Sequence, residues 1–278
     1  MNRSRLAPGA GIVTAPGDRP VLRTSEGEFL RIDTGRVGPG ELVDRLTEGE
    51  GHTSSAELDR LVAAFEEAGH AVTEPRRPPL TGRTVHLLGD PVLTEPLARF
   101  AAAEGAEVQP ATAADLAGLA GRRTAVVWCL DSPVPEGLWD EADRLPARHT
   151  AWLRCHREGA HTWTEPLASA PGDVTAAHVR LRRLAATAAH RELAAYWAGH
   201  RTPDTGPHPT EPAAALIAAL LTADLIAWAS GEPHQGSGLP ARRRLRRIDL
   251  RDLTFTKHPV LPVPEVAPLP APTARTAP

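Results

Sequence analysis

The segment Thr124-Ala-Val-Val-Trp-Cys-Leu-Asp131 carries the strongest buried-strand pattern in this sequence. A short, continuous apolar run of this kind is typical of a strand that is covered on both faces. Upstream, strand patterns at 84–88 and 106–109 alternate with helix patterns at 92–104 and 113–119. This alternation predicts an α/β fold, with a mostly parallel sheet and helices on its faces.

Downstream of this strand the alternation continues, although less regularly. We expect helices at 136–145, 176–184, 191–198 and 213–230, and strands at 152–156, 162–165, 245–250 and 253–258, the last two as a hairpin. The helix at 213–230 is nearly all apolar, which predicts that it is buried. The tail is so rich in proline that we expect residues 265–278 to be disordered.

The first 76 residues show a different pattern of three short strands followed by two helices. The strands are expected at 11–14, 21–24 and 28–33, and the helices at 40–46 and from Ser54 or Ser55 to a stop at Gly69. Such a set predicts a small winged-helix-like module over residues 1–76. The stiff linker Pro75-Arg-Arg-Pro-Pro79 then separates it from an α/β domain over residues 80–264.

The composition excludes several classes of protein. The chain has 278 residues, a formal net charge of −3 and two cysteines, which excludes a disulfide-stapled miniprotein and gives no general argument for nucleic-acid binding. No apolar run reaches the ~18–20 residues of a membrane helix, and residues 1–14 lack the apolar core of a secretion signal. We therefore expect a cytoplasmic protein with reduced thiols and no membrane partner.

The turn after the strand at 84–88 stands where a nucleotide-binding loop would lie in such a sheet. It reads Gly89-Asp-Pro-Val-Leu-Thr94, with one glycine, a carboxylate that repels phosphate and a proline without an N–H group. It fits neither G-x-G-x-x-G nor a Walker loop, so we expect no cofactor. Cys129 and Cys155 form no C-x-x-C pair, the histidines lack metal-ligand spacing, and no serine lies in a nucleophile motif. We therefore expect no metal and no catalytic residue.

The densest cluster of charge is Arg242-Arg-Arg-Leu-Arg-Arg247. It could bind phosphate or nucleic acid, but no aromatic residue interleaves with it. Alternation along a strand would place its arginines on both faces and Leu245 inward. We interpret the cluster as a solvated hairpin.

The strand at 28–33 offers a binding surface. In a three-stranded antiparallel module one strand must lie at an edge, where its unpaired N–H and C=O groups can accept another chain as an added strand. The second helix would pack beside it, and we expect its apolar residues to be divided between the core and a groove for guest side chains. The candidate peptide-binding residues are Glu28, Phe29, Leu30, Arg31, Ile32, Asp33, Leu58, Leu61, Val62 and Phe65.

Several segments, in their order along the chain, resemble a known family. They are Val21-Leu-Arg23, Glu28-Phe-Leu-Arg-Ile-Asp33, His52-Thr-Ser-Ser-Ala-Glu-Leu-Asp-Arg-Leu-Val62, Trp152-Leu-Arg-Cys-His-Arg-Glu-Gly-Ala-His161, Glu165-Pro-Leu-Ala-Ser-Ala-Pro-Gly172, Arg180-Leu-Arg-Arg-Leu-Ala185, Leu245-Arg-Arg-Ile-Asp-Leu250 and His258-Pro-Val-Leu-Pro262. With the alanine-rich helix, this series resembles the ocin-ThiF-like F proteins, the leader-peptide-binding proteins of azole and thiopeptide biosynthesis. Their products are ribosomally made and modified peptides (RiPPs). The resemblance implies a RiPP recognition element followed by a degenerate, Rossmann-like ThiF domain.

The resemblance also implies a function without catalysis. Such a protein binds the leader segment of a ribosomal precursor peptide and delivers it to a partner, a YcaO-type cyclodehydratase that uses ATP. Catalytic relatives hold zinc with two cysteine pairs and use a lysine near the nucleotide. At these positions this chain has Asp173-Val-Thr-Ala-Ala-His178 and Glu265-Val-Ala-Pro268, and its only lysine, Lys257, lies in the C-terminal hairpin. A homodimer follows by analogy with ThiF-like folds.

Two other interpretations stay open. A divergent adenylating enzyme could activate a peptide with ATP, if Arg83, Arg122 or Arg180 replaced the usual lysine. A DNA-binding winged helix is the weaker alternative, because the second helix would bring carboxylates to the phosphates. Those carboxylates belong to Glu57, Asp59, Glu66 and Glu67.

Overall fold

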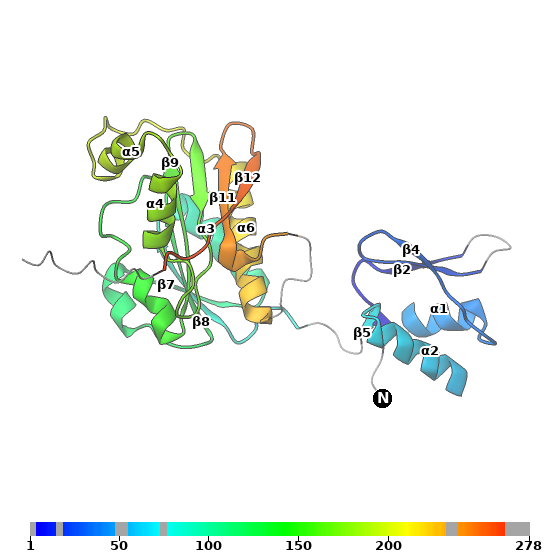
Figure 1. The fold of residues 1–278 in the computed structure, drawn as a ribbon. Coiled ribbons are helices and arrows are strands. Elements are labelled where there is room, and N and C mark those ends of the chain that lie inside the picture. Colours follow the sequence, from blue (N-terminus) through cyan, green and yellow to red (C-terminus); the bar gives the residue numbers. More distant parts are fainter. Residues whose placement is uncertain (1–3, 15–18, 48–54, 73–76, 232–237, 265–278) are drawn as a thin grey trace, which may run out of the picture. The chain divides into compact units, whose positions relative to one another are not determined.

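The computed structural model describes residues 4–14, 19–47, 55–72, 77–231 and 238–264. The chain forms two compact units, Met1–Arg77 and Pro78–Pro278, and each is described by itself (Figure 1). The division falls inside the proline-rich stretch at 75–79. The predicted tail at 265–278 lies outside the described residues.

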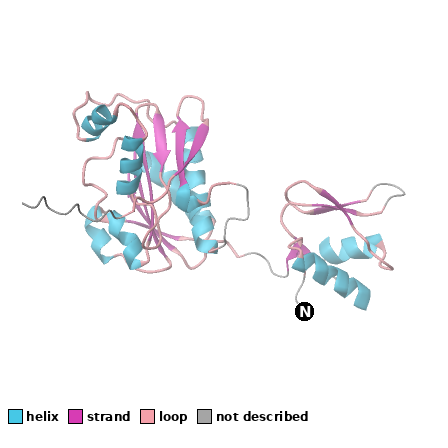
Figure 2. Ribbon diagram, in the orientation of Figure 1, coloured by secondary structure: helices cyan, strands magenta, loops and turns pink. Residues whose placement is uncertain are grey.

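The first unit is built from short antiparallel strands and two helices (Figure 2). Strands β2 (Gly11–Val13), β3 (Val21–Arg23) and β4 (Phe29–Arg31) form a sheet in the order β2-β3-β4. Strands β1 (Arg5–Leu6) and β5 (Ala71–Val72) pair separately. Helices α1 (Pro39–Thr47) and α2 (Ala56–Glu67) complete the unit.

Local sequence explains where α2 begins and ends. The Ser55 hydroxyl accepts the Leu58 N–H at 3.1 Å, which caps the first turn. Gly69, two residues beyond the helix, has a φ of +75°, the left-handed backbone that glycine adopts without strain. Between these ends the helix buries one apolar face against Leu22 and Ile32 of the sheet layer and Leu42 and Leu46 of α1, together with Val37 and Ala71.

The second unit contains a seven-stranded sheet in the order β12-β11-β10-β9-β8-β6-β7. Its strands are β6 (Thr84–Gly89), β7 (Glu107–Pro110), β8 (Thr124–Leu130), β9 (Ala151–Glu158), β10 (His161–Thr164), β11 (Arg244–Asp249) and β12 (Phe255–Pro259). β7, β6, β8 and β9 are parallel, whereas β10, β11 and β12 join by antiparallel pairing. β11 therefore runs in the direction of the parallel group, and the prediction of a mostly parallel sheet with flanking helices is confirmed.

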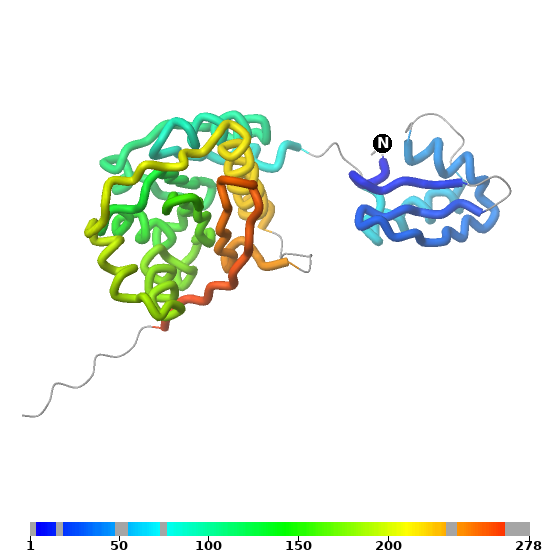
Figure 3. The backbone as a smooth tube through the Cα atoms, turned by 90° about the horizontal axis from the view of Figure 1, so that it is seen from above, coloured from blue at the N-terminus to red at the C-terminus, as the bar shows by residue number. Residues whose placement is uncertain are grey.

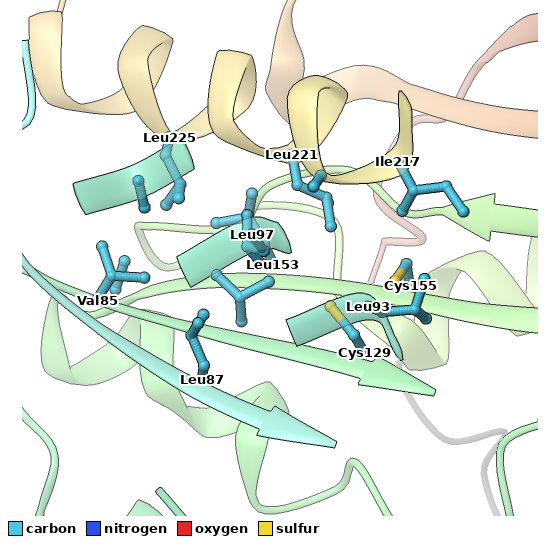
Figure 4. Packing of buried hydrophobic residues seen from close by; sticks show 14 of the residues in the cluster. Val85, Leu87, Leu93, Leu97, Cys129, Leu153, Cys155, Ile217, Leu221 and Leu225 are labelled. Atoms are coloured by element: carbon cyan, nitrogen blue, oxygen red, sulfur yellow. The ribbon is translucent and has the colours of Figure 1, made fainter. Parts of the chain in front are cut away.

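Helices cover both faces of this sheet. On one face α3 (Pro91–Ala103) and α6 (Glu211–Ser230) pack on β6, β8 and β9, and Figure 4 shows Leu97, Leu221 and Leu153 meeting there. On the other face Val126 and Trp152 pack against the short 3₁₀ segments Ala113–Gly118 and Ala142–Arg148. α4 (Ala176–Ala185) and α5 (His190–Trp197) follow the β9–β10 hairpin.

The α-helices predicted at 113–119 and 136–145 are wrong: the chain forms 3₁₀ helices at Ala113–Gly118 and Ala142–Arg148, and residues 136–141 form turns. Pro146 lies inside the second 3₁₀ helix and has no N–H to donate. Helix α6 is long and apolar enough to cross a membrane by length and composition alone, contrary to our expectation that no such run exists. Its buried face packs in the sheet core, and Figure 3 shows it beside the β11–β12 hairpin.

Candidate functional site

β4 lies at an edge of the three-stranded sheet. Within the part of the chain that the structure describes, it pairs with β3 and with no other strand. An open edge of this kind leaves a row of backbone N–H and C=O groups that another chain can pair with. The candidate site therefore consists mainly of backbone hydrogen-bonding groups, with the side chains of β4 beside them.

The printed hydrogen bonds show which residues of this strand face outward. The Ile32 N–H donates to Pro20 O at 3.2 Å, and the Thr24 N–H donates to Glu28 O at 2.8 Å. Successive residues of a strand direct their backbone groups to opposite sides, so even-numbered residues serve the pairing with β3. The N–H and C=O groups of Phe29 and Arg31 consequently point to the open side.

The side chains of β4 alternate between the two faces of the sheet. Leu30 stands opposite the buried Leu22 and so belongs to the helix-facing side, yet it is 42% exposed because no further strand covers it. Phe29 and Arg31 belong to the outer face, and Phe29 is 63% exposed. Phe29 and Leu30 are therefore two adjacent exposed apolar side chains, one on each face of the open edge.

A hollow lies on each side of the open edge. One is lined by the chain that follows β4 and by α2, with Asp33, Arg36, Arg60 and Leu61 among its walls. The other lies on the outer face of the sheet and is lined by Val13, Arg19, Val21, Phe29, Arg31, Ile32 and Asp33. Asp33 borders both hollows, so they flank the same end of β4. An added strand would direct alternate side chains to the two of them.

The predicted site residues separate into two groups. Glu28, Phe29, Leu30, Arg31 and Asp33 are exposed along the edge, and Leu61 is half-buried in the wall of the hollow beside α2. The other four are buried in the core of the first unit, with exposures of 3–7%: Ile32, Leu58, Val62 and Phe65. The prediction that these four side chains contact a guest peptide does not fit their burial, whereas a peptide-binding role for the exposed group stays a prediction.

The turn after β6 lies where nucleotide-binding loops occur in sheets of this kind. Gly89 has a φ of +108°, and a Cβ there would meet the Cys129 carbonyl oxygen at 1.8 Å, so β6 and β8 approach closely at this point. The Asp90 carboxylate accepts the Asp131 N–H at 2.6 Å. Pro91 has no N–H, and the Leu93 and Thr94 N–H groups both donate to Asp90 O. These residues do not fit a phosphate, because a carboxylate occupies the position and the first turn of α3 has few free donors.

The neighbouring strand end carries a second carboxylate. Asp131 accepts from Arg157 Nε at 2.5 Å and pairs with His208 Nδ1 at 2.5 Å. Arg157 is almost fully buried, and its Nη1 also lies 2.9 Å from Asp204. The loop around 203–208 is thereby tied to the carboxyl ends of the parallel strands. No sequence pattern indicates this network, because its members are distant along the chain.

A cavity of about 100 Å³ lies between β9, α4, Trp197 of α5 and the segment 134–143. Its charged groups are largely paired with one another: Glu158 accepts from Arg183 Nη1 at 3.0 Å and Trp197 Nε1 at 2.7 Å, and Glu165 accepts from Arg154 Nε at 2.6 Å. Among described residues, no group of three or more histidines, cysteines or carboxylates suited to a metal ion occurs. The open edge of β4 is therefore the stronger candidate.

The arginine cluster at 242–247 is not fully solvated, so our interpretation of it as a solvated hairpin is wrong. Arg246 is 2% exposed and contacts the buried Asp224 of α6 at 2.6 and 2.9 Å, and Arg244 contacts the same carboxylate at 2.5 Å. Leu245 is buried on the opposite face, as predicted. The inward arginines of β11 thus hold α6 on the sheet and are not free for phosphate.

Comparison with solved structures places this fold among known ones. The heterocyclase TruD superposes with a TM-score of 0.66 at 12% identity, over 94% of this chain and 42% of that one. A heterocyclase in complex with substrate and cofactor gives a TM-score of 0.64 at 10% identity, over 94% and 39%. E. coli MccB with ATP gives a TM-score of 0.55 at 9% identity, over 95% and 98%.

These identities establish a shared fold and no more. The chain spans about two fifths of the length of the two heterocyclase chains. No protein-family model matches the sequence, and no curated protein matches it either. The fold is thus one that the heterocyclase TruD and E. coli MccB share with this chain.

Proposed function

We propose that this protein is a non-catalytic leader-peptide-binding protein of azole-type RiPP biosynthesis. Its first unit acts as a winged-helix-like peptide-recognition element that takes the leader of a ribosomal precursor peptide as an added strand on β4. The free edge of β4, with the outward backbone groups of Phe29 and Arg31, carries the proposal. Main-chain hydrogen bonds supply affinity in this mode, and the flanking hollows supply selectivity.

The second unit serves in this proposal as a degenerate ThiF-like scaffold. Two carboxylates, Asp90 and Asp131, stand at the carboxyl ends of adjacent strands where a nucleotide would otherwise bind. Both are engaged in internal hydrogen bonds, so the position is filled by the protein's own polar groups. This arrangement supports a binding role over an adenylating one.

The partner we propose is a separate YcaO-type cyclodehydratase. The fold likeness to heterocyclases supports a place beside such an enzyme. Holding the leader near that enzyme raises the local concentration of the peptide to be cyclised, to roughly the mM range for a short flexible tether. No chemistry on this chain is needed for that gain.

The proposal is tested by two substitutions at one position of the edge. A fluorescein-labelled leader peptide, taken from a candidate precursor of the same genome, is titrated into the full chain, and binding is followed by anisotropy. Arg31→Pro removes an N–H that points away from β3, and proline is tolerated at such an edge position. Arg31→Ala removes the same side chain but keeps the N–H, so it is the matched control. We expect Arg31→Pro to bind at least about tenfold more weakly than Arg31→Ala, from the lost hydrogen bond and the clash of the ring.

Equal affinity of the two variants would contradict the added-strand mode. Retained dispersion in the ¹H–¹⁵N spectrum shows whether Arg31→Pro keeps the fold. If the variant unfolds, two leader peptides replace it, one N-methylated at the odd-numbered residues and one at the even-numbered residues. One of the two must lack the N–H donors that face β4, and that peptide should bind more weakly. Release of pyrophosphate or phosphate from ATP by the full chain with peptide would instead favour the adenylating enzyme.

A further inference from the structure

The outer face of the small sheet carries arginines that the protein does not neutralise. Arg23 of β3 and Arg31 of β4 lie on this face, and Arg19 precedes β3. All three are exposed, and none has a carboxylate partner among the described residues. Asp33 is the carboxylate at the same end, and its Oδ1 already accepts the Gly35 N–H at 3.1 Å. The face next to the open edge is therefore net positive.

The helix-facing side of the same edge has a different character. Leu30 is exposed there, and Leu61 with Ala64 lines the hollow against α2. The charged residues at the rim of this hollow offset one another, since Arg36 and Arg60 stand with Asp33 and Glu57. This side therefore offers apolar contact without a net charge.

An added strand meets both sides at once. Its successive side chains point alternately to the outer face and to the helix-facing side. Side chains directly opposite one another on paired strands have Cβ atoms about 4.5–5.5 Å apart. Two guest residues on the outer face therefore lie beside Phe29 and Arg31, and the guest residue between them lies beside Leu30 on the helix-facing side.

We propose that the guest segment at β4 is a strand with alternating chemistry, acidic on its outward positions and aliphatic on its helix-facing ones. This inference rests on the proposed function and specifies its substrate. Outward carboxylates pair with Arg31 and, across the sheet, reach toward Arg23. Helix-facing aliphatic side chains cover Leu30 and fill the hollow beside Leu61. A second copy of the same edge is disfavoured, because it would add another unpaired Arg31 to the positive outer face instead of a carboxylate.

The test uses three fluorescein-labelled synthetic peptides with Gly-Ser ends and the full chain. One core alternates leucine with glutamate, one alternates leucine with lysine, and one holds the residues of the first in separate leucine and glutamate blocks. We expect the alternating glutamate peptide to bind at least about tenfold more tightly than either of the others, as two exposed ion pairs and correct alternation require. The double variant Arg23→Glu/Arg31→Glu should reverse the order of the glutamate and lysine peptides.

Two results would overturn the inference. Equal binding of the glutamate and lysine peptides would remove the charge rule, and equal binding of the alternating and block peptides would show only non-specific attraction to arginine. Binding of the leader peptide used in the previous test shows whether the alternation rule alone is wrong or the proposed function is wrong as well. If Arg31→Pro weakens leader binding relative to Arg31→Ala but Arg23→Glu/Arg31→Glu leaves it unchanged, the proposed function stands and the alternation rule is wrong. If neither change affects the leader, the binding site itself is wrong.

Discussion

At the scale of single residues, Asp224 is a buried carboxylate with two arginine partners in the second unit. It is 1% exposed on α6 and contacts both Arg244 and Arg246 of β11. Removing one partner of a buried ion pair leaves the other charge uncompensated in a medium that solvates it poorly. This carboxylate therefore joins an apolar helix to a basic strand.

We predict that Asp224→Asn lowers the free energy of unfolding by about 3–5 kcal/mol. Urea unfolding followed by tryptophan fluorescence reports this directly, since all six tryptophans lie in the second unit. Glu141→Gln is the matched control: it weakens two partly exposed pairs, with Arg144 and Arg148, each worth at most about 1 kcal/mol. A cost for Asp224→Asn no larger than that of the control would show that the buried cluster is dispensable.

Glu158 makes stability depend on pH. Burial raises the pKa of its carboxyl, but hydrogen bonds from His156 and Arg183 outweigh burial and hold the pKa well below the usual value of 4.5. A carboxylate whose pKa is lower in the folded chain stabilises the fold above the unfolded pKa and loses that effect as the pH falls.

We predict that Glu158→Gln lowers the free energy of unfolding by about 2–3 kcal/mol at pH 7, the value of hydrogen bonds to a charged group. The difference from the wild type should shrink as the pH is lowered below about 4.5. Urea titrations at several pH values measure it, with Glu95→Gln, exposed on α3, as the control for the substitution itself. A difference that stays constant down to pH 3 would contradict the role given to this carboxylate.

At the scale of elements, α2 divides its apolar residues unequally. Phe65 faces the core and is 7% exposed, whereas Leu61 is half-buried and lines the hollow beside the edge. The spacing of apolar residues along α2 predicts one apolar face, but it does not predict how many of those residues the core covers. That width depends on α1 and on Ile32 and Val37, which pack against α2 from elsewhere in the chain.

We predict that Leu61→Ala and Phe65→Ala have opposite profiles. Leu61→Ala should weaken leader binding about threefold to tenfold with a stability cost near 1 kcal/mol, because it removes apolar contact at a half-exposed site. Phe65→Ala should cost about 3–5 kcal/mol of stability, as expected for a core phenylalanine. Anisotropy measures the first effect, and far-UV circular dichroism or NMR the second, since the first unit has no tryptophan. Normal leader binding by Leu61→Ala would exclude the hollow as a contact.

At the scale of the whole molecule, local pattern was enough to predict most of the elements. The three strands β2, β3 and β4 and the four parallel strands of the second unit lie within a residue or two of the expected positions, because each is a short apolar run bounded by turn residues. The two-residue strands β1 and β5 were not predicted. The turn at Gly89 was also predicted, but its close approach to Cys129 of β8 comes from the structure. The mixed α/β class with flanking helices is confirmed.

What the sequence could not predict depends on contacts between distant segments. The pairing of Arg246 with Asp224 joins residues 22 positions apart, and that of His208 with Asp131 joins residues 77 apart. The 3₁₀ helices at 113–118 and 142–148 pack on the sheet through Leu116 and Leu145, which are contacts with segments distant in the sequence. The identity of the outward residues of β4 required the hydrogen-bond register, which only the folded chain supplies.

Residue-resolved amide exchange of the full chain, with and without the leader peptide, tests the central claim most directly. In the free protein the amides of Phe29 and Arg31 should exchange rapidly, whereas that of Leu30, which faces β3, should be slower. Bound leader should slow Phe29 and Arg31 strongly and leave Leu30 little changed. Protection that appears elsewhere, while these two amides continue to exchange at their free rates, would contradict the account.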